Sequence, residues 1–188
     1  VKTENGKTLP IDDTVRADDD LIIQMALFRN GFYGYFSDKQ YPHIKKAFKE
    51  WPCVAKDFWF WSYDANFHRY LAYYDSVDNI SDNVRGFKER CISYLCINGS
   101  YETRRIWQSN IRAYVYRKCM WDTSLDCNAL ADEYLRLYYK EGAGAVKAVM
   151  DLFHENNLKR ETAGEEVRCE NFGTDERPEG NPEKLLYK

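Results

Sequence analysis

Three short hydrophobic runs occur in the first half of the chain, and polar residues follow each of them. Residues 21–28 (LIIQMALF) form a short run that is apolar apart from Gln24, which is typical of a strand buried on both faces. Residues 57–74 (DFWFWSYDANFHRYLAYY) begin as an aromatic run that also predicts a buried strand. A third strand is predicted at residues 91–97 (CISYLCI), before a turn at residues 98–100. The aromatic run is expected to contribute core residues, namely Phe58, Trp59, Phe60 and Trp61.

The segments that separate and follow these runs have helical periodicity. Apolar residues recur at helical spacing between Asp38 and Trp51, and Pro42 suits the first turn of that helix. A short amphipathic helix is predicted at residues 81–90 and a longer one at residues 101–120. The arginines of the longer helix are expected to face solvent: Arg104, Arg105, Arg112 and Arg117. Alternating strands and helices predict an α/β fold of parallel βαβ units, with the carboxyl ends of the strands at one sheet edge.

Three strands are too few for a closed barrel, so two architectures remain open. The sheet is either small and open, or part of a barrel whose other strands lie upstream of Val1. We expect residues 1–19 to be a loop or linker and residues 20–120 to be the partial barrel. Residues 121–158 should form a helical hairpin packed on it, and residues 159–188 a charged tail. In the hairpin, Asp126 or Asn128 can cap the first helix. The side of the first helix that faces the core is expected to carry Leu130, Tyr134, Leu137 and Tyr138. The corresponding side of the second helix is expected to carry Val146, Val149, Met150 and Phe153.

Composition narrows the function classes. The net charge of -3 argues against a nucleic-acid partner, and the apolar runs are too short to cross a membrane. Aromatic residues make up 16% of the chain, and Tyr and Trp combine the flat apolar face and polar rim of sugar-binding surfaces. The six cysteines contain no C-x-x-C pair and have no histidine at ligand spacing, so we expect reduced thiols and neither metal nor cofactor.

The strand ends hold the candidate site. Glycoside hydrolysis needs two carboxyl groups across the scissile bond, and Asp64 and Glu102 follow adjacent predicted strands. Glu102 could equally stabilise the first turn of its helix, and Asp64 could be a turn residue. The other polar and aromatic residues at these ends are expected to contact substrate: Arg29, Asn30, Trp61, Tyr63, Asn66, His68 and Asn98.

Several stretches resemble a bacterial domain-of-unknown-function family of glycoside-hydrolase-like proteins, related in barrel architecture to alpha-glucuronidases. The most specific is residues 121–155 (WDTSLDCNALADEYLRLYYKEGAGAVKAVMDLFHE), with its Tyr-Tyr corner before Gly142. WSYDANF at residues 61–67 is similar to the family's aromatic-strand motif, and ISYLCINGSYE is similar to the family's next strand and turn. AYVYRKCMW at residues 113–121 is similar to the helix that follows in the family. The chain departs from the pattern at Ser62 and at Ile97-Asn98, where relatives often carry acidic residues or glutamine.

The resemblance covers about residues 20–156 and implies the C-terminal portion of a TIM-like (β/α) barrel with parallel strands, followed by a helical hairpin. It implies a secreted or periplasmic protein that hydrolyses a polysaccharide or a uronic-acid-containing glycan, with the rest of the same barrel as its partner. Two alternatives stay open. The missing acidic positions favour a non-catalytic glycan-binding module, and an exposed sheet edge would favour a structural or interaction domain.

Overall fold

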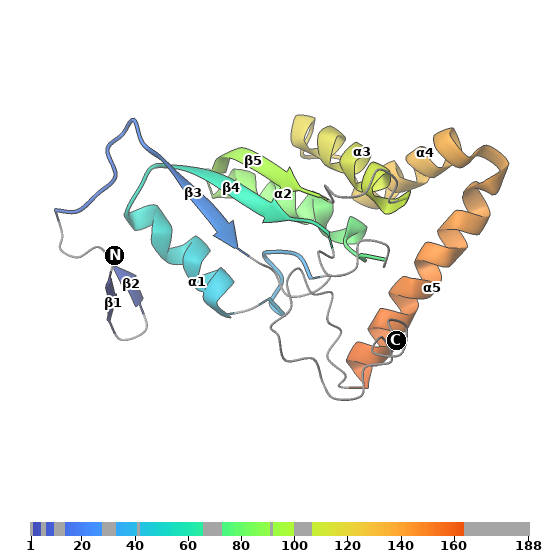
Figure 1. Ribbon diagram of the computed structural model, residues 1–188, viewed down its shortest axis with the longest axis horizontal. Helices are drawn as coiled ribbons and strands as arrows, with labels where there is room; N and C mark the ends of the chain where they lie inside the picture. The colour runs from blue at the N-terminus through green and yellow to red at the C-terminus, as the bar shows by residue number, and fades with distance from the viewer. Residues whose placement is uncertain are drawn as a thin grey trace, which may run out of the picture.

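The protein is a mixed α/β unit built on a three-stranded parallel sheet. In the computed structural model, the described residues are 2–4, 7–9, 14–27, 33–40, 42–65, 73–90, 92–99 and 107–163. The strands β3 (Ile22–Leu27), β4 (Asp57–Tyr63) and β5 (Ile92–Asn98) lie in sequence order, and both pairings are parallel (Figure 1). Residue pairing shifts once, between Phe58 and Trp59, where β5 carries an extra residue. This arrangement confirms the predicted parallel sheet.

Two helices connect the strands and cover the same face of the sheet. Helix α1 (Pro42–Glu50) links β3 to β4, and α2 (Ile80–Glu89) links β4 to β5. The ring of Phe60 lies 5.2 Å from Phe48 of α1 and 4.7 Å from Phe87 of α2, measured between centroids. Phe58 and Phe60 are buried in this cluster. This side is called the covered face below.

The opposite side of the sheet, called the open face below, leaves large apolar side chains exposed. Trp59 is 38% exposed, Ile22 45% and Tyr94 52%. The prediction that the first strand is buried on both faces is therefore wrong, and so is the assignment of Trp59 to the core. Side chains alternate between the two faces of a strand, and both sheet helices pack on only one of them.

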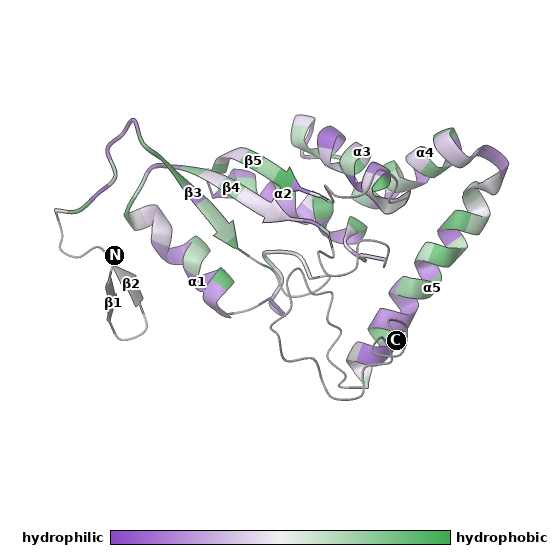
Figure 2. Ribbon diagram, viewed as in Figure 1, coloured by the Kyte–Doolittle hydropathy of each residue, from purple (hydrophilic) through white to green (hydrophobic). Residues whose placement is uncertain are grey.

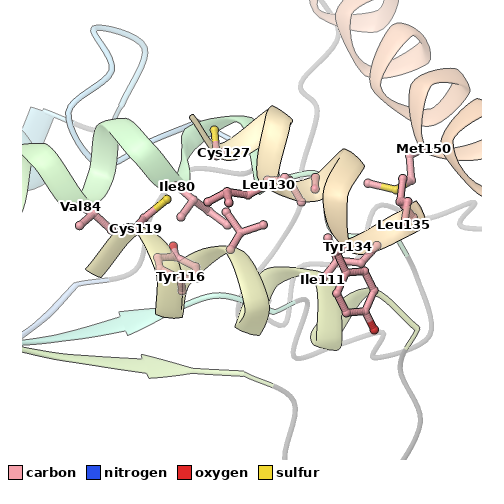
Figure 3. Close-up of a cluster of buried hydrophobic side chains, with 13 residues drawn as sticks. Ile80, Val84, Ile111, Tyr116, Cys119, Cys127, Leu130, Tyr134, Leu135 and Met150 are labelled. Atoms are coloured by element: carbon pink, nitrogen blue, oxygen red, sulfur yellow. The ribbon is translucent and has the colours of Figure 1, made fainter. Parts of the chain in front are cut away.

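Three further helices form a second layer beside the sheet. Helices α3 (Trp107–Trp121), α4 (Cys127–Tyr139) and α5 (Ala143–Thr162) follow one another, and α3 packs on α2 as well as on α4. Side chains from α2, α3, α4 and α5 meet in one cluster around Ile111, Cys119 and Leu130 (Figure 3). Asp126 caps α4, accepting a 2.7 Å hydrogen bond from the backbone N–H of Ala129, which confirms one of the two predicted caps.

The helical hairpin buries less of its apolar surface than its sequence predicts. Leu130, Tyr134 and Met150 are buried, whereas four other residues of the predicted stripes are exposed: Leu137, Tyr138, Val149 and Phe153. Green and purple residues interleave along all of α5, which runs down the side of the molecule away from the sheet (Figures 1 and 2). The helix continues to Thr162, beyond the predicted start of the tail at residue 159.

Smaller differences concern the ends of the chain and the cysteines. The region predicted as an N-terminal loop contains an antiparallel pair of short strands, β1 (Lys2–Glu4) and β2 (Lys7–Leu9). Cys96, Cys119 and Cys127 are free, as expected, and burial raises the pKa of the Cys119 thiol. Among the described residues, no helix has the length and apolar character needed to cross a membrane.

Candidate functional site

The carboxyl ends of β4 and β5 lie side by side and bring four of the predicted site residues to one edge. Tyr63 pairs with Asn98 across the strands, and the backbone N–H of Asp64 donates a 2.9 Å hydrogen bond to the Asn98 carbonyl oxygen. Trp61 lies two residues before Tyr63 on the same strand. The expectation that neighbouring strand ends meet at one edge is confirmed for Trp61, Tyr63, Asp64 and Asn98.

The four residues do not share one side of the sheet. Trp61 and Tyr63 alternate with the buried Phe60 and Ser62, so they belong to the open face. The Trp61 indole N–H donates to the Asn98 side-chain oxygen at 3.2 Å, with the Asn98 amide oriented so that its nitrogen donates to the Gly99 carbonyl oxygen. The Trp59 and Trp61 rings are neighbours, with centroids 6.2 Å apart. The open face therefore ends in partly exposed aromatic rings beside a fixed amide.

Asp64 points instead to the covered side, where α3 holds its partner. The Arg112 Nε lies 3.2 Å from Asp64 Oδ2, and the two side chains are 4% and 1% exposed. Arg112 Nη1 also donates to the Tyr74 carbonyl oxygen at 3.4 Å, and the guanidinium lies over the Tyr74 ring. The prediction that Arg112 faces solvent is wrong, because its charge is neutralised inside the protein by Asp64.

One hollow lies at this sheet edge, and a second lies further back along the strands. A cavity of about 300 Å³ between β5 and α3 is lined by Asp64, Ile97, Arg112 and Arg117, among others. A shallower depression of about 700 Å³ lies along β5 and Trp59 and includes Ile22, Tyr94 and Cys96. The first is at the lower end of the size range of small-ligand sites, and the second is a mostly apolar surface groove.

A tyrosine that the sequence reasoning missed fixes the ends of β3 and β4. The Tyr35 hydroxyl donates to the Leu27 carbonyl oxygen at 3.1 Å and accepts from Ser62 Oγ at 3.3 Å and from the Tyr63 N–H at 3.2 Å. The backbone N–H of Tyr35 is held in turn by the Asn83 side chain. Tyr35 is fully buried, so its hydroxyl joins the ends of β3 and β4 inside the core.

A second polar group lies away from the sheet edge, between residues 73–78 and α5. His154 Nδ1 lies 2.9 Å from Asp75 Oδ2 and 3.3 Å from Asp78 Oδ2. Carboxylates and imidazole are also divalent-cation ligands, and the three ligand atoms lie within 4.8 Å of one another. The contacts observed are those of an ion pair. Neither the spacing of the two aspartates nor the distant histidine signals this group in the sequence.

Burial and charge act together at this second group. Burial raises the pKa of Asp78, the neighbouring Asp75 raises it further, and His154 opposes the shift. Burial and the same two carboxylates also raise the pKa of the Tyr73 phenol, which therefore stays neutral. The region disfavours additional negative charge.

Five residues predicted to belong to the site lie outside the described part of the chain. They are Arg29, Asn30, Asn66, His68 and Glu102. Their roles stay predictions.

The fold and the site define a class: a mixed α/β domain whose parallel sheet is covered on one face and ends in aromatic and amide side chains. The chain belongs to the family DUF4838, a domain of unknown function, whose model matches residues 10–151. This confirms the expected membership of a domain-of-unknown-function family. The family description names no activity, so kinship with glycoside hydrolases stays a prediction. No match was found among curated proteins or among solved structures.

Proposed function

We propose that this domain is carbohydrate-active and holds a glycan at the carboxyl ends of β4 and β5. The observation that carries the proposal is the grouping of Trp61, Tyr63 and Asn98 on the open face at this edge. Sugar rings present apolar C–H faces surrounded by hydroxyl groups. Partly exposed indole and phenol rings suit the C–H faces, and an amide held in one orientation suits the hydroxyl groups.

The proposed wider architecture is a TIM-like barrel to which this chain contributes three strands. The strands lie in sequence order, and both connecting helices cover one face, which is the local pattern of a (β/α) barrel. The open face would then be part of the barrel interior, covered by strands from the N-terminal part of the same barrel. Barrel enzymes bind substrate at the carboxyl ends of their strands, where Trp61, Tyr63 and Asn98 lie.

In the catalytic form of the proposal, the domain hydrolyses a polysaccharide or a uronic-acid-containing glycan. Asp64 and Glu102 form the carboxylate pair that glycoside hydrolysis requires. Because Asp64 is paired with the guanidinium of Arg112, it would be the ionised member, acting as base or nucleophile. Glu102 would then be the proton donor.

A non-catalytic glycan-binding module is the second candidate, and the position of Asp64 favours it. This carboxylate is 1% exposed and lies on the covered side, whereas Trp61 and Tyr63 lie on the open face. A ligand stacked on the open face could therefore bind without meeting Asp64. The same aromatic residues would carry the affinity in both forms.

Glycan binding is tested first, with a pair of tryptophan variants. Affinity for a panel of neutral and uronic-acid-containing oligosaccharides is measured by calorimetry with the longest expressed form of the protein. Trp61→Ala should reduce affinity at least tenfold. Trp121→Ala removes the same side chain from the end of α3, where it is 94% exposed, and should leave affinity unchanged. Equal affinities in both variants, or self-association without any glycan binding, would overturn the proposal.

Hydrolysis is then measured on the glycans that bind. Loss of product release in Asp64→Asn and in Glu102→Gln, with binding retained, would support the carboxylate pair. Binding by a correctly folded wild-type protein without turnover would favour the binding module. Undiminished turnover in both variants would remove these residues from catalysis.

A further inference from the structure

The cavity of about 300 Å³ between β5 and α3 lies on the covered side of the sheet. Alternate residues along and just after β5 border it, namely Leu95, Ile97 and Gly99. Leu95 and Ile97 lie opposite the buried Phe60 and Ser62 of β4, so this face of the strand is the covered one. No side chain fills the space at Gly99, where a Cβ atom would meet nothing within 4 Å. The cavity is therefore open at the carboxyl end of β5.

The charged groups that line the cavity are two arginines and one aspartate, which leaves an excess of one positive charge. Asp64 and Arg112 neutralise each other at 3.2 Å, and both side chains are buried. Arg117 also lines the cavity, but it is exposed and forms no ion pair with any described residue. Its guanidinium is therefore free to pair with an anion from outside the chain.

A buried hydroxyl group on the same helix also lacks a partner. Ser109 of α3 lines the cavity, and its Oγ is buried without a hydrogen-bond partner among the residues that the structure describes. A buried hydroxyl group without a partner costs free energy, because it has lost its hydrogen bonds to water. A ligand with an acceptor atom in the cavity would remove that cost, since a serine hydroxyl donates one hydrogen bond.

We propose that this cavity binds a small organic carboxylate that has an apolar body and a further oxygen atom. An arginine guanidinium matches a carboxylate in charge and in shape, and it holds the two oxygens through parallel N–H···O hydrogen bonds. Arg117 binds the carboxylate, and Ser109 donates to the further oxygen. The apolar side chains of Leu95, Ile97 and Met120 receive the body of the ligand.

The proposed ligand site is separate from the proposed glycan site. Trp61, Tyr63 and Asn98 are not among the residues that line the cavity, and the two aromatic side chains belong to the opposite face of the sheet. The excess charge also selects the class of ligand, because Arg117 repels a cation and gains no charge pairing from a neutral compound. This inference does not depend on the proposed glycan function.

An NMR titration with two matched probes tests the charge preference. The probes are 4-hydroxybenzoate and its uncharged analogue 4-hydroxybenzamide, added to the longest expressed form of the protein. The wild-type protein should bind the carboxylate about tenfold more tightly, since only the carboxylate pairs with Arg117. Arg117→Gln should remove that preference. Arg136→Gln makes the same change at an exposed position of α4 outside the cavity and should keep it.

Three results of that titration overturn the proposal. They are the absence of binding by 4-hydroxybenzoate, equal affinities for the two probes in the wild-type protein, and an unchanged preference in Arg117→Gln. Because Arg117 is exposed, its replacement is not expected to prevent folding, so each of these results is informative.

Four further variants show where the probe binds. Gly99→Leu fills the cavity from the strand side and should abolish binding of 4-hydroxybenzoate, whereas Gly144→Leu adds the same side chain in open space on α5 and should bind as wild type. Ser109→Ala should weaken binding about threefold. Trp61→Ala should bind this probe as wild type, although it removes the proposed glycan platform. Loss of binding in Trp61→Ala with full binding in Gly99→Leu would place the probe on the open face and overturn the cavity site.

Discussion

The two faces of the sheet use the same residue types for different purposes. On β4, Phe58 and Phe60 are 2% and 0% exposed, and they pack against α1 and α2. Trp59 on the same strand is 38% exposed, and Tyr94 of β5 is 52% exposed. The aromatic richness of the chain thus has two origins, because one set of rings fills the core and the other set forms a surface.

Polar groups differ between the two faces in the same way. On the covered side, Asp64 and Arg112 neutralise each other almost out of contact with solvent. On the open face, Asn98 orients a partly exposed Trp61. The covered side therefore buries its charged pair, whereas the open face keeps its aromatic and amide groups partly exposed to solvent.

The largest expected effect is the loss of a ring from the covered face. Phe60→Ala should lower the free energy of unfolding by about 3–5 kcal/mol, because the ring is fully buried among Phe48, Phe87 and Tyr35. Trp59→Ala is the matched change one position away and should cost about 1 kcal/mol. Urea denaturation followed by far-ultraviolet circular dichroism measures both. Similar losses in the two variants would remove the distinction between the faces.

Breaking the covered ion pair should have the next largest effect. Asp64→Asn should cost about 3 kcal/mol, because it leaves the Arg112 guanidinium buried without its counter-charge. The double variant Asp64→Leu with Arg112→Met should recover much of that loss, since apolar residues of similar size often replace a buried pair at little cost. The measurement is a double-mutant cycle in urea, made of Asp64→Leu, Arg112→Met and the variant that carries both changes. Additive losses would show that the two charges are not coupled.

The sequence predicted the parallel sheet because strands and helices alternate with clear spacing. It also identified Asp126 as one of two possible caps, since an aspartate immediately before a helical stripe is a strong N-terminal signal. It could not separate the two faces of β4, because Phe58, Trp59, Phe60 and Trp61 are all aromatic. Exposure there depends on which side the helices pack, and local sequence does not contain that information.

For the candidate site, the prediction placed Trp61, Tyr63, Asp64 and Asn98 at one edge but did not show that Asp64 turns away from the others. The missing information was its partner. Arg112 has the hydrophilic character of a surface residue, and it is buried because a carboxylate from a distant strand end meets it. Long-range pairs of this kind, like that of His154 with Asp75, leave no periodic signal in a single sequence.

A glycine on α2 tests how tightly the covered side is packed. A methyl group at Gly86 would overlap the Phe36 ring, so Gly86→Ala should cost about 1–3 kcal/mol. Helix propensity alone would favour alanine by about 1 kcal/mol. The sign of the change in the free energy of unfolding therefore shows whether steric overlap or helix propensity is the larger effect. Gly144→Ala in α5 is the matched control, because open space surrounds that position and the change should stabilise the protein. The measurement is the thermal unfolding of both variants compared with the wild-type protein. If Gly86→Ala stabilises the protein, the Phe36 ring moves aside easily.

The smallest expected effect is on the open face, at Tyr94. Tyr94→Thr keeps a residue that favours strands and removes a ring that is about half exposed, so the free energy of unfolding should change by less than about 0.5 kcal/mol. This holds for the chain of 188 residues, in which neither α1 nor α2 packs over that face. If further strands of a barrel cover the open face in a longer form of the protein, the same substitution there should cost about 2 kcal/mol or more, because the ring would then be buried. Urea denaturation of the variant in both lengths of chain therefore measures whether the open face is an exposed surface or a barrel interior. Equal small losses in the two forms would argue against the barrel, whereas a large loss in the short chain would contradict the exposure of Tyr94 itself.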